Sequence, residues 1–149
     1  MTKTRPPVCD YEGSTYRTDF WEGQGREYED LVERIALRHL LPQRGNRLLE
    51  IGAGFGRLTD CYHGYEQIVL LDYSRSQLRQ AQERLGRSDR YLYVAADLYA
   101  MPFVDGLFDT ATLIRTIHHV QDVPAALGEV RRVLRPQGTF ILELSLIHI

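Results

Sequence analysis

The chain has 149 residues, of which 44% are hydrophobic and 26% are charged, and its formal net charge is −2. These values are typical of one globular domain with a buried core, and they exclude a general binder of nucleic acids or of membrane surfaces. No apolar run approaches the roughly 20 residues of a membrane-spanning helix, so we expect no membrane partner. From the net charge, we also expect no nucleic acid as a partner.

The chain starts with a polar, proline-containing stretch that shows no signal peptide. Its two cysteines, Cys9 and Cys61, are far apart and lack the spacing of a metal site. We therefore expect free thiols in a reducing compartment, a cytoplasmic location and no bound metal.

Residues 1–19 are expected to form a flexible arm. Its residues Tyr11 and Tyr16 either pack on the domain surface or help to cover a ligand, because tyrosine is favoured at interfaces. From about residue 26 to residue 41, apolar residues recur at steps of three and four. This spacing predicts an amphipathic helix with one apolar face. The residues that line this face are Leu31, Val32, Ile35, Ala36, His39 and Leu40.

The next stretch, LLEIGAGFGRL at 48–58, predicts a buried strand over 47–51, a glycine turn, and a helix over about 56–63. Glycines at alternate positions let a ligand approach the backbone near a helix N-terminus. Strand, turn and helix in this order are typical of the entry point for a nucleotide-type cofactor in an open α/β sheet. A dinucleotide fingerprint would need glycine at position 57, where this chain has Arg57.

Two more apolar strands, at 67–72 and 91–95, are each followed by a carboxylate. Asp72 ends the first and can accept two hydrogen bonds from a ribose diol. Asp97 follows the second and can accept a hydrogen bond from an adenine amino group, with Leu98 packed on the ring. Between the strands, Ser74 predicts the start of a helix that Gly86 ends.

The remaining elements complete an alternation of strands and helices, which predicts a parallel sheet covered on both faces. A strand is expected at 108–114, a helix that begins after Asp122 and ends at Pro136, and a last strand at 139–144. At the end of the strand at 108–114 lie His118 and His119, which either serve as a general base or pack against the sheet and support the loop.

Taken together, the chain resembles the core of class I S-adenosylmethionine-dependent methyltransferases, in particular the small-molecule type 11 group. The resemblance covers roughly residues 20–143 and implies an α/β, Rossmann-like, doubly wound parallel sheet with strand order 3-2-1-4-5 and an N-terminal helix. The family usually has glycine where this chain has Gln137. The motifs that carry the resemblance are EIGAGFGRL at 50–58, LLD at 70–72, AADL at 95–98, MPF at 101–103, FDTA at 108–111, HHV at 118–120 and EVRRVLRPQG at 129–138.

The resemblance implies S-adenosylmethionine as the cofactor and assigns residues to it. Asp72 would hold the ribose hydroxyls and Tyr73 would lie against the adenine. The main chain near Arg115 would hold the amino-acid end, while Arg26 and Tyr28 would close over the cofactor. The cofactor-binding residues are expected to be Glu50, Gly52, Ala53, Gly54, Gly56, Asp72, Tyr73, Ala96, Asp97, Leu98, Arg115, Arg26 and Tyr28.

The expected activity is methyl transfer to a small-molecule acceptor by in-line displacement, with His118 and His119 as the candidate catalytic residues. One alternative is a non-catalytic or truncated fragment that binds S-adenosylmethionine, and a second is an NAD(P)-dependent oxidoreductase. The family core continues beyond the last strand, so we expect a methyltransferase domain over 20–143 that is incomplete at its C-terminus. Residues 144–149 match a reading frame of a transposon-end sequencing adapter, which predicts a non-native tail. The acceptor and the oligomeric state stay open.

Overall fold

A computed structural model describes residues 10–144 of the chain. Its five strands form one parallel sheet in the order β3-β2-β1-β4-β5, which confirms the predicted topology. Residues 1–9 of the expected arm and residues 145–149 of the expected tail lie outside the described part. The strands are β1 (Gly45–Ile51), β2 (Tyr65–Asp72), β3 (Tyr91–Ala95), β4 (Phe108–Ile114) and β5 (Leu134–Glu143).

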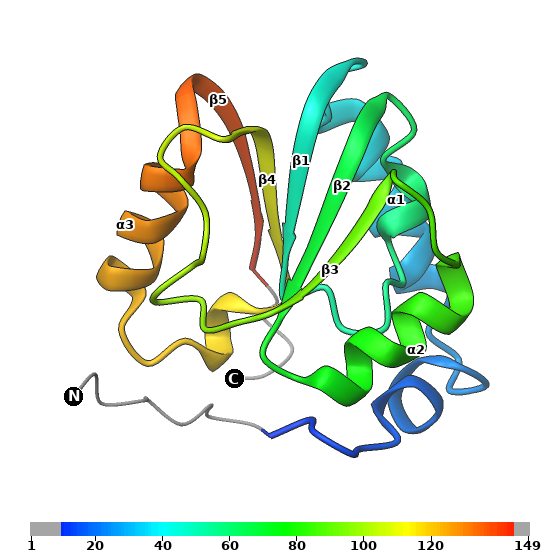
Figure 1. Cartoon of the computed structure of the whole chain (residues 1–149). Helices are drawn as coiled ribbons and strands as arrows, with labels where there is room; N and C mark the ends of the chain where they lie inside the picture. The colour runs from blue at the N-terminus through cyan, green and yellow to red at the C-terminus, as the bar shows by residue number, and fades with distance from the viewer. Residues whose placement is uncertain (1–9, 145–149) are drawn as a thin grey trace.

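Helices cover both faces of this sheet, as Figure 1 shows, because alternate residues of each central strand point to opposite faces. Leu48 and Ile68 pack with the face that carries α1 (Glu27–Leu40) and α2 (Arg75–Leu85). Leu49 and Val69 pack with the opposite face, against α3 (Val123–Val133). The sheet is therefore covered on both faces, as the alternation of elements predicts, and the fold is the doubly wound, Rossmann-like arrangement that the resemblance implied.

The helix starts follow from local side-chain hydrogen bonds. The Ser74 hydroxyl accepts from the Gln77 N–H at 3.2 Å and begins α2, while the Asp122 carboxylate accepts from the Ala125 N–H at 3.0 Å and begins α3. Each bond satisfies one of the amide donors that a helix leaves unpaired at its first turn. Both capping residues were identified from the sequence.

Three predicted elements are wrong in their extent, and one of them is the last strand, which was expected over 139–144 and runs over Leu134–Glu143. The helix expected over 56–63 is replaced by turns and one short 3₁₀ helix, Thr59–Cys61, because Gly54 and Gly56 have φ of 54° and 75°, outside the right-handed helical region. The helix after Asp122 ends at Val133, so Pro136 lies inside β5 and not at a helix end. A proline is compatible with that place because β5 is at the edge of the sheet.

The apolar face predicted for the first helix does not pack on the domain. Leu31, Val32 and Ile35 are 54%, 44% and 44% exposed, whereas Glu33 and Leu37 on another side of α1 are buried. The buried side is the one that carries Glu33, whose carboxylate forms ion pairs with arginines of the sheet edge. The inward side of α1 therefore combines an ion-pairing carboxylate with the apolar Leu37, which packs in the core.

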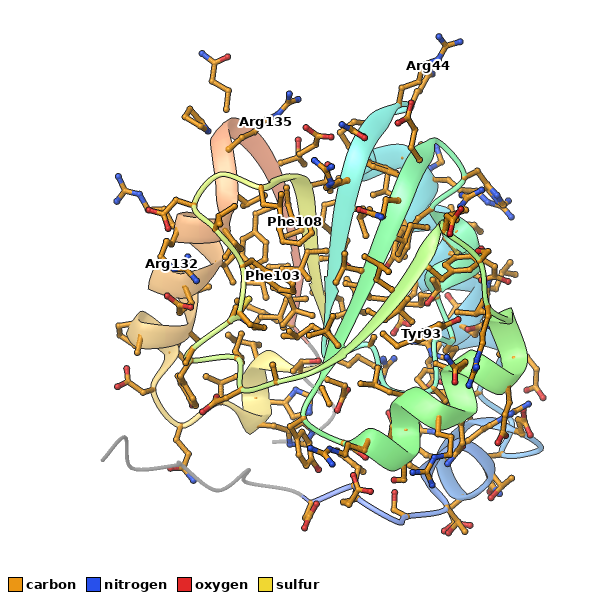
Figure 2. The ribbon with its side chains drawn as sticks, in the orientation of Figure 1. Arg44, Tyr93, Phe103, Phe108, Arg132 and Arg135 are labelled. Atoms are coloured by element: carbon orange, nitrogen blue, oxygen red, sulfur yellow. The ribbon has the colours of Figure 1, made fainter. Side chains whose placement is uncertain are left out.

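The labelled side chains of Figure 2 mark the layers and one end of the sheet. Phe103 and Phe108 lie between α3 and the sheet, with ring centroids 5.0 Å apart. Arg44 and Arg135 lie at the end where β1 and β5 begin, and the N-terminal segment crosses the opposite end (Figure 1). Within residues 10–144, the structure has no helix that is both long and apolar enough to cross a membrane.

Candidate cofactor site

A cavity of about 470 Å³ opens at the carboxyl ends of the central strands. The last residues of β1, β2 and β4 form its floor, and the segment from Tyr11 to Trp21 lines its outer side (Figure 1). Ligands of open α/β sheets bind at this edge, and the volume lies in the range of small-molecule sites. The structure therefore has a cavity at the edge of the sheet where the sequence predicts the ligand site.

The glycine turn forms one wall of the cavity, and its backbone conformation requires glycine. Gly52 has φ of 69°, and a Cβ there would lie 2.3 Å from the Thr116 Oγ1. Gly54 has φ of 54°, and its N–H donates to the Asp72 carboxylate at 2.8 Å. Gly56 has a different role, because it does not line the cavity and packs closely against Leu85 of α2.

Asp72 lies buried at the end of β2, where two backbone amides hold it. Its Oδ2 accepts from the Gly54 N–H at 2.8 Å, and its Oδ1 accepts from the Ser74 N–H at 2.9 Å. Burial raises the pKa of this carboxyl, and the two amides oppose that rise. Because each carboxylate oxygen has a second lone pair, the fixed carboxylate can still accept hydrogen bonds from a pair of hydroxyls in the cavity.

Beside Asp72, the ends of β2 and β3 supply four further predicted residues to the cavity wall. The Tyr73 hydroxyl accepts from the Tyr11 N–H and donates to Asp10 at 3.1 Å. The Asp97 carboxylate accepts from the Tyr99 N–H at 2.9 Å, which fixes its position at the cavity. The four residues are Tyr73, Ala96, Asp97 and Leu98.

Glu50 lies at the end of β1 and is buried beneath the glycine turn. Its carboxylate accepts from the Thr59 hydroxyl at 2.6 Å and from the Tyr62 hydroxyl at 3.4 Å. Burial raises the pKa of Glu50 to about 7, against the lowering effect of these two hydrogen bonds. Glu50 therefore gains and loses a proton near neutral pH, at the floor of the cavity.

A second wall of the cavity is built from ion pairs that the sequence did not reveal. Glu33 of α1 pairs with both Arg57 and Arg115, and all three side chains are at least 86% buried. Trp21 lies against both arginines, with guanidinium carbons 3.5 and 5.1 Å from its ring centroid. Trp21, Arg57 and Arg115 line the cavity, so we call these three residues and Glu33 the ion-pair wall.

Arg115 has an unusual backbone for a non-glycine residue, with φ of 53°. Its N–H donates to the Glu143 carboxylate of β5 at 3.0 Å, so this main-chain donor, expected at the amino-acid end of the cofactor, already has a protein partner. Its side chain lies within the ion-pair wall. The pairing of Glu33 with the arginines of this wall could not be seen in the sequence, because Glu33 is one of several charged residues at polar positions of the predicted helix.

A profile of the methyltransferase domain family matches residues 49–142, which is more than half of the chain. The chain belongs to this methyltransferase family. The family's methyl donor is S-adenosylmethionine, and the sheet edge described above is the edge at which the sequence predicts its binding.

Several methyltransferases are similar to this chain. The ubiquinone/menaquinone biosynthesis C-methyltransferase UbiE of Paracoccus denitrificans is 36% identical over 114 residues, which cover 71% of this chain and 45% of the relative. The 27-O-demethylrifamycin SV methyltransferase of Amycolatopsis mediterranei is 28% identical, with 87% and 51% covered. A crystal structure of an S-adenosylmethionine-dependent methyltransferase from Mesorhizobium loti is 32% identical with a TM-score of 0.65, and covers 72% and 51%. The chain thus spans about half the length of the curated relatives it matches.

The cavity of this methyltransferase chain fits the family's cofactor in its donor set. Asp72 supplies a fixed carboxylate, and the glycine turn beside it presents bare backbone to the cavity at Gly52 and Gly54. A second carboxylate, Asp97, lies farther along the edge, next to the apolar Leu98. A buried amide, Gln77, also lines the cavity with no hydrogen-bond partner within residues 10–144.

The two candidate histidines are placed differently. His119 lines the cavity and its Nε2 lies 3.1 Å from the Tyr11 hydroxyl, whereas His118 does not line it. The two rings are 4.0 Å apart, so His118 supports the ring of His119. Of the two candidate bases, only His119 is placed to reach a molecule in the cavity.

Arg26 and Tyr28, which were expected to close over the cofactor, do not line the cavity. Arg26 pairs with Glu29 at 3.3 Å and lies over the Phe20 ring at 3.7 Å, while Tyr28 is 76% exposed. Both lie on the first turn of α1 or just before it, and the inward side of that helix is the one that carries Glu33. Instead, Tyr11, Tyr16 and Trp21 line the outer side of the cavity, which agrees with the second of the two interpretations of the arm tyrosines.

Proposed function

We propose that this chain binds S-adenosylmethionine in the cavity and catalyses transfer of the methyl group to a small-molecule acceptor by in-line displacement. The observation that carries the proposal is Asp72, a buried carboxylate held by the Gly54 and Ser74 amides at the edge of the cavity. The relatives support it, because their names describe methyltransferases, among them one for a rifamycin.

In this proposal each part of the cavity binds one part of the cofactor. Asp72 accepts hydrogen bonds from the ribose hydroxyls, and Asp97 accepts one from the adenine amino group while Leu98 packs on the ring. The glycine turn at Gly52 and Gly54 and the backbone near Arg115 surround the methionine end. All of these residues line the same cavity, which supports the assignment.

When bound, the cofactor's sulfonium supplies a methyl group that is already activated for transfer. The protein then has to orient the acceptor and exclude water, and orientation can supply up to about 7–11 kcal/mol of the acceleration. Tyr11, Tyr16 and Trp21 narrow the access of water, since they line the outer side of the cavity. We infer that His119, whose ring contacts the Tyr11 hydroxyl, accepts the acceptor's proton where the acceptor carries one.

A second candidate function is cofactor binding without turnover. It is compatible with the coverage of the relatives, since the chain matches 45% and 51% of the length of two curated methyltransferases. An NAD(P)-dependent oxidoreductase is not favoured, because position 57 carries an arginine that pairs with Asp30 and Glu33 where the dinucleotide fingerprint needs glycine.

Calorimetry with S-adenosylhomocysteine tests the proposed function on the wild type, Asp72→Ala and a control, Asp89→Ala. Asp72→Ala should weaken binding by about 1–3 kcal/mol, the range for loss of hydrogen bonds to a charged group. Asp89 is exposed and does not line the cavity, so its removal should leave the affinity unchanged. Binding of NAD in place of S-adenosylhomocysteine, or an equal effect of both substitutions, would contradict the proposal.

Turnover is tested separately with S-adenosylmethionine that is isotopically labelled on the methyl group and a panel of phenols, amines and enolisable ketones. Label should pass to at least one acceptor class and should depend on His119 where that acceptor must lose a proton. Binding of the cofactor without label transfer to any class would favour the second candidate function.

A further inference from the structure

The cavity contains a buried side-chain amide whose role the proposed function leaves open. Gln77 is 1% exposed, and neither its Oε1 nor its Nε2 has a hydrogen-bond partner in the described part of the chain. A buried amide without a partner is costly, and most buried polar atoms in proteins are hydrogen-bonded. Because Gln77 also lines the cavity, a bound molecule can supply the partner that the protein does not.

Local structure fixes where this amide lies. Gln77 belongs to the first turn of α2, and its own N–H donates to the capping Ser74 hydroxyl at 3.2 Å. Its side chain reaches toward the glycine turn, since a Cβ on Gly54 would lie 3.9 Å from the Gln77 Oε1. The N–H of the same Gly54 donates to Asp72. Asp72 and Gln77 therefore flank one glycine, from the end of β2 and from the start of α2.

The two side chains have complementary hydrogen-bonding capacity. An ionised carboxylate only accepts hydrogen bonds, whereas a sugar hydroxyl both donates one and accepts others. Asp72 can take the proton of a hydroxyl but offers nothing to that hydroxyl's oxygen. The NH₂ group of a glutamine supplies two donors, which is the capacity that Asp72 lacks.

We propose that Gln77 binds the sugar of the nucleoside cofactor, with its Nε2 donating to a ribose hydroxyl oxygen whose proton Asp72 accepts. This inference rests on the proposed function, because it assumes a nucleoside in the cavity. Gln77 is then a cofactor-binding residue. Its unpaired amide destabilises the free protein, and the sugar supplies the missing hydrogen-bond partner on binding.

The test compares Gln77→Met with Gln82→Met, the same change on the same helix at a residue that does not line the cavity. Methionine has a similar length and no hydrogen-bonding amide. Gln77→Met should leave the thermal midpoint of the free protein unchanged or raised, and it should weaken S-adenosylhomocysteine binding about tenfold or more. Gln82→Met should change the affinity less than twofold.

A comparison of cofactor analogues identifies the group that Gln77 contacts. The loss caused by Gln77→Met should be the same for S-adenosylhomocysteine and for 5′-methylthioadenosine, which lacks the amino-acid end. It should shrink to less than twofold for the 2′-deoxy or the 3′-deoxy form of S-adenosylhomocysteine, because one of these lacks the hydroxyl that Gln77 contacts. A full loss with both deoxy forms, or a loss confined to ligands with the amino-acid end, would overturn the assignment to the sugar.

The outcomes separate this inference from the proposed function. If the wild type does not bind S-adenosylhomocysteine, the proposed function fails. If the wild type binds it and Gln77→Met binds equally well, the inference alone is overturned. If Gln77→Met does not fold, nuclear magnetic resonance of the wild type tests the inference. The side-chain amide signals of Gln77 should shift, and their protons should exchange more slowly with solvent, when S-adenosylhomocysteine is bound. Unchanged signals would overturn the inference.

Discussion

Two walls of the same cavity are built in different ways. The nucleoside corner, which consists of Gly54, Asp72 and Gln77, lies on the glycine turn and the β2–α2 junction and uses backbone amides to hold its carboxylate. The ion-pair wall joins Trp21, Glu33, Arg57 and Arg115 from four separate parts of the chain through charged side chains. One wall depends on local backbone geometry, and the other depends on how distant elements pack.

This difference has consequences for stability. Backbone amides are held in place by the strand and the turn, so the corner is pre-organised before any ligand arrives. Buried ion pairs gain little net stability over apolar contacts, but loss of one partner leaves an uncompensated buried charge. We therefore expect the free energy of unfolding to be sensitive to changes in the ion-pair wall, whereas changes in the corner alter mainly ligand affinity.

The largest effect is expected from Glu33→Gln, which leaves Arg57 and Arg115 without their shared carboxylate. The free energy of unfolding, measured with urea, should fall by about 3–5 kcal/mol, the range for one broken buried pair. Glu29→Gln on the same helix removes a more exposed partner of Arg26 and should cost less than about 1 kcal/mol. Equal losses from both substitutions would mean that the ion-pair wall contributes no more to the free energy of unfolding than an exposed ion pair does.

The next effect in size is a pH dependence from Glu50, which lies buried at the floor of the same cavity. Burial raises the pKa of Glu50 to about 7 in the folded state, above its ordinary value of 4.5. The folded state therefore binds this proton more tightly than the unfolded state. The stabilising contribution is present below about pH 4.5, decreases as the pH rises toward about 7, and amounts to about 3 kcal/mol in total.

Glu50→Gln isolates this contribution, because other carboxyls have their own pH dependence. The difference in unfolding free energy between the wild type and Glu50→Gln should change steadily between about pH 4.5 and 7 and then level off. Urea unfolding of both proteins across that range provides the measurement. A constant difference at every pH would show that Glu50 titrates in the folded state as it does in the unfolded state.

The smallest of these effects is the difference in unfolding free energy between two glycine substitutions, and it tests how closely the glycine turn beside the corner is packed. Gly52→Ala and Gly106→Ala both place a side chain at φ near 70°, but only at position 52 would the Cβ meet another side chain, 2.3 Å from the Thr116 Oγ1. At Gly106 the nearest atom is at 3.7 Å. Both should lose about 1–2 kcal/mol from the left-handed backbone, and Gly52→Ala about 1–3 kcal/mol more from crowding. Equal losses would show that Thr116 moves aside without cost.

The residues of the corner show what could be predicted from the sequence. Asp72 was identified because it ends an apolar strand, and Ser74 because it precedes a helical pattern. The glycine turn was identified by its spacing, although the helix expected after it was wrong. All of these signals lie within a few residues of the group they concern, and a strand or a cap depends mainly on such neighbours.

The ion-pair wall and the first helix show what could not be predicted. The apolar pattern of α1 pointed to Leu31, Val32 and Ile35 as one packed face, but the structure buries Glu33 and Leu37 instead. Arg26 and Tyr28, which belong to the start of the same helix, were expected to close over the cofactor, and they do not line the cavity. Trp21, which contacts both arginines of the wall, carried no signal that linked it to either of them.

The sequence by itself determined the glycine turn and the carboxylates at the strand ends, because these follow from hydrophobic periodicity and from glycine's access to positive φ. The strand order was implied by the resemblance of its motifs to a known family. Only the tertiary structure decided which side of α1 faces inward, that Glu33 joins Arg57 and Arg115, and that Tyr11 reaches His119. The physical reason is that charge pairing and burial depend on the three-dimensional distance between segments, and spacing along the chain does not fix that distance.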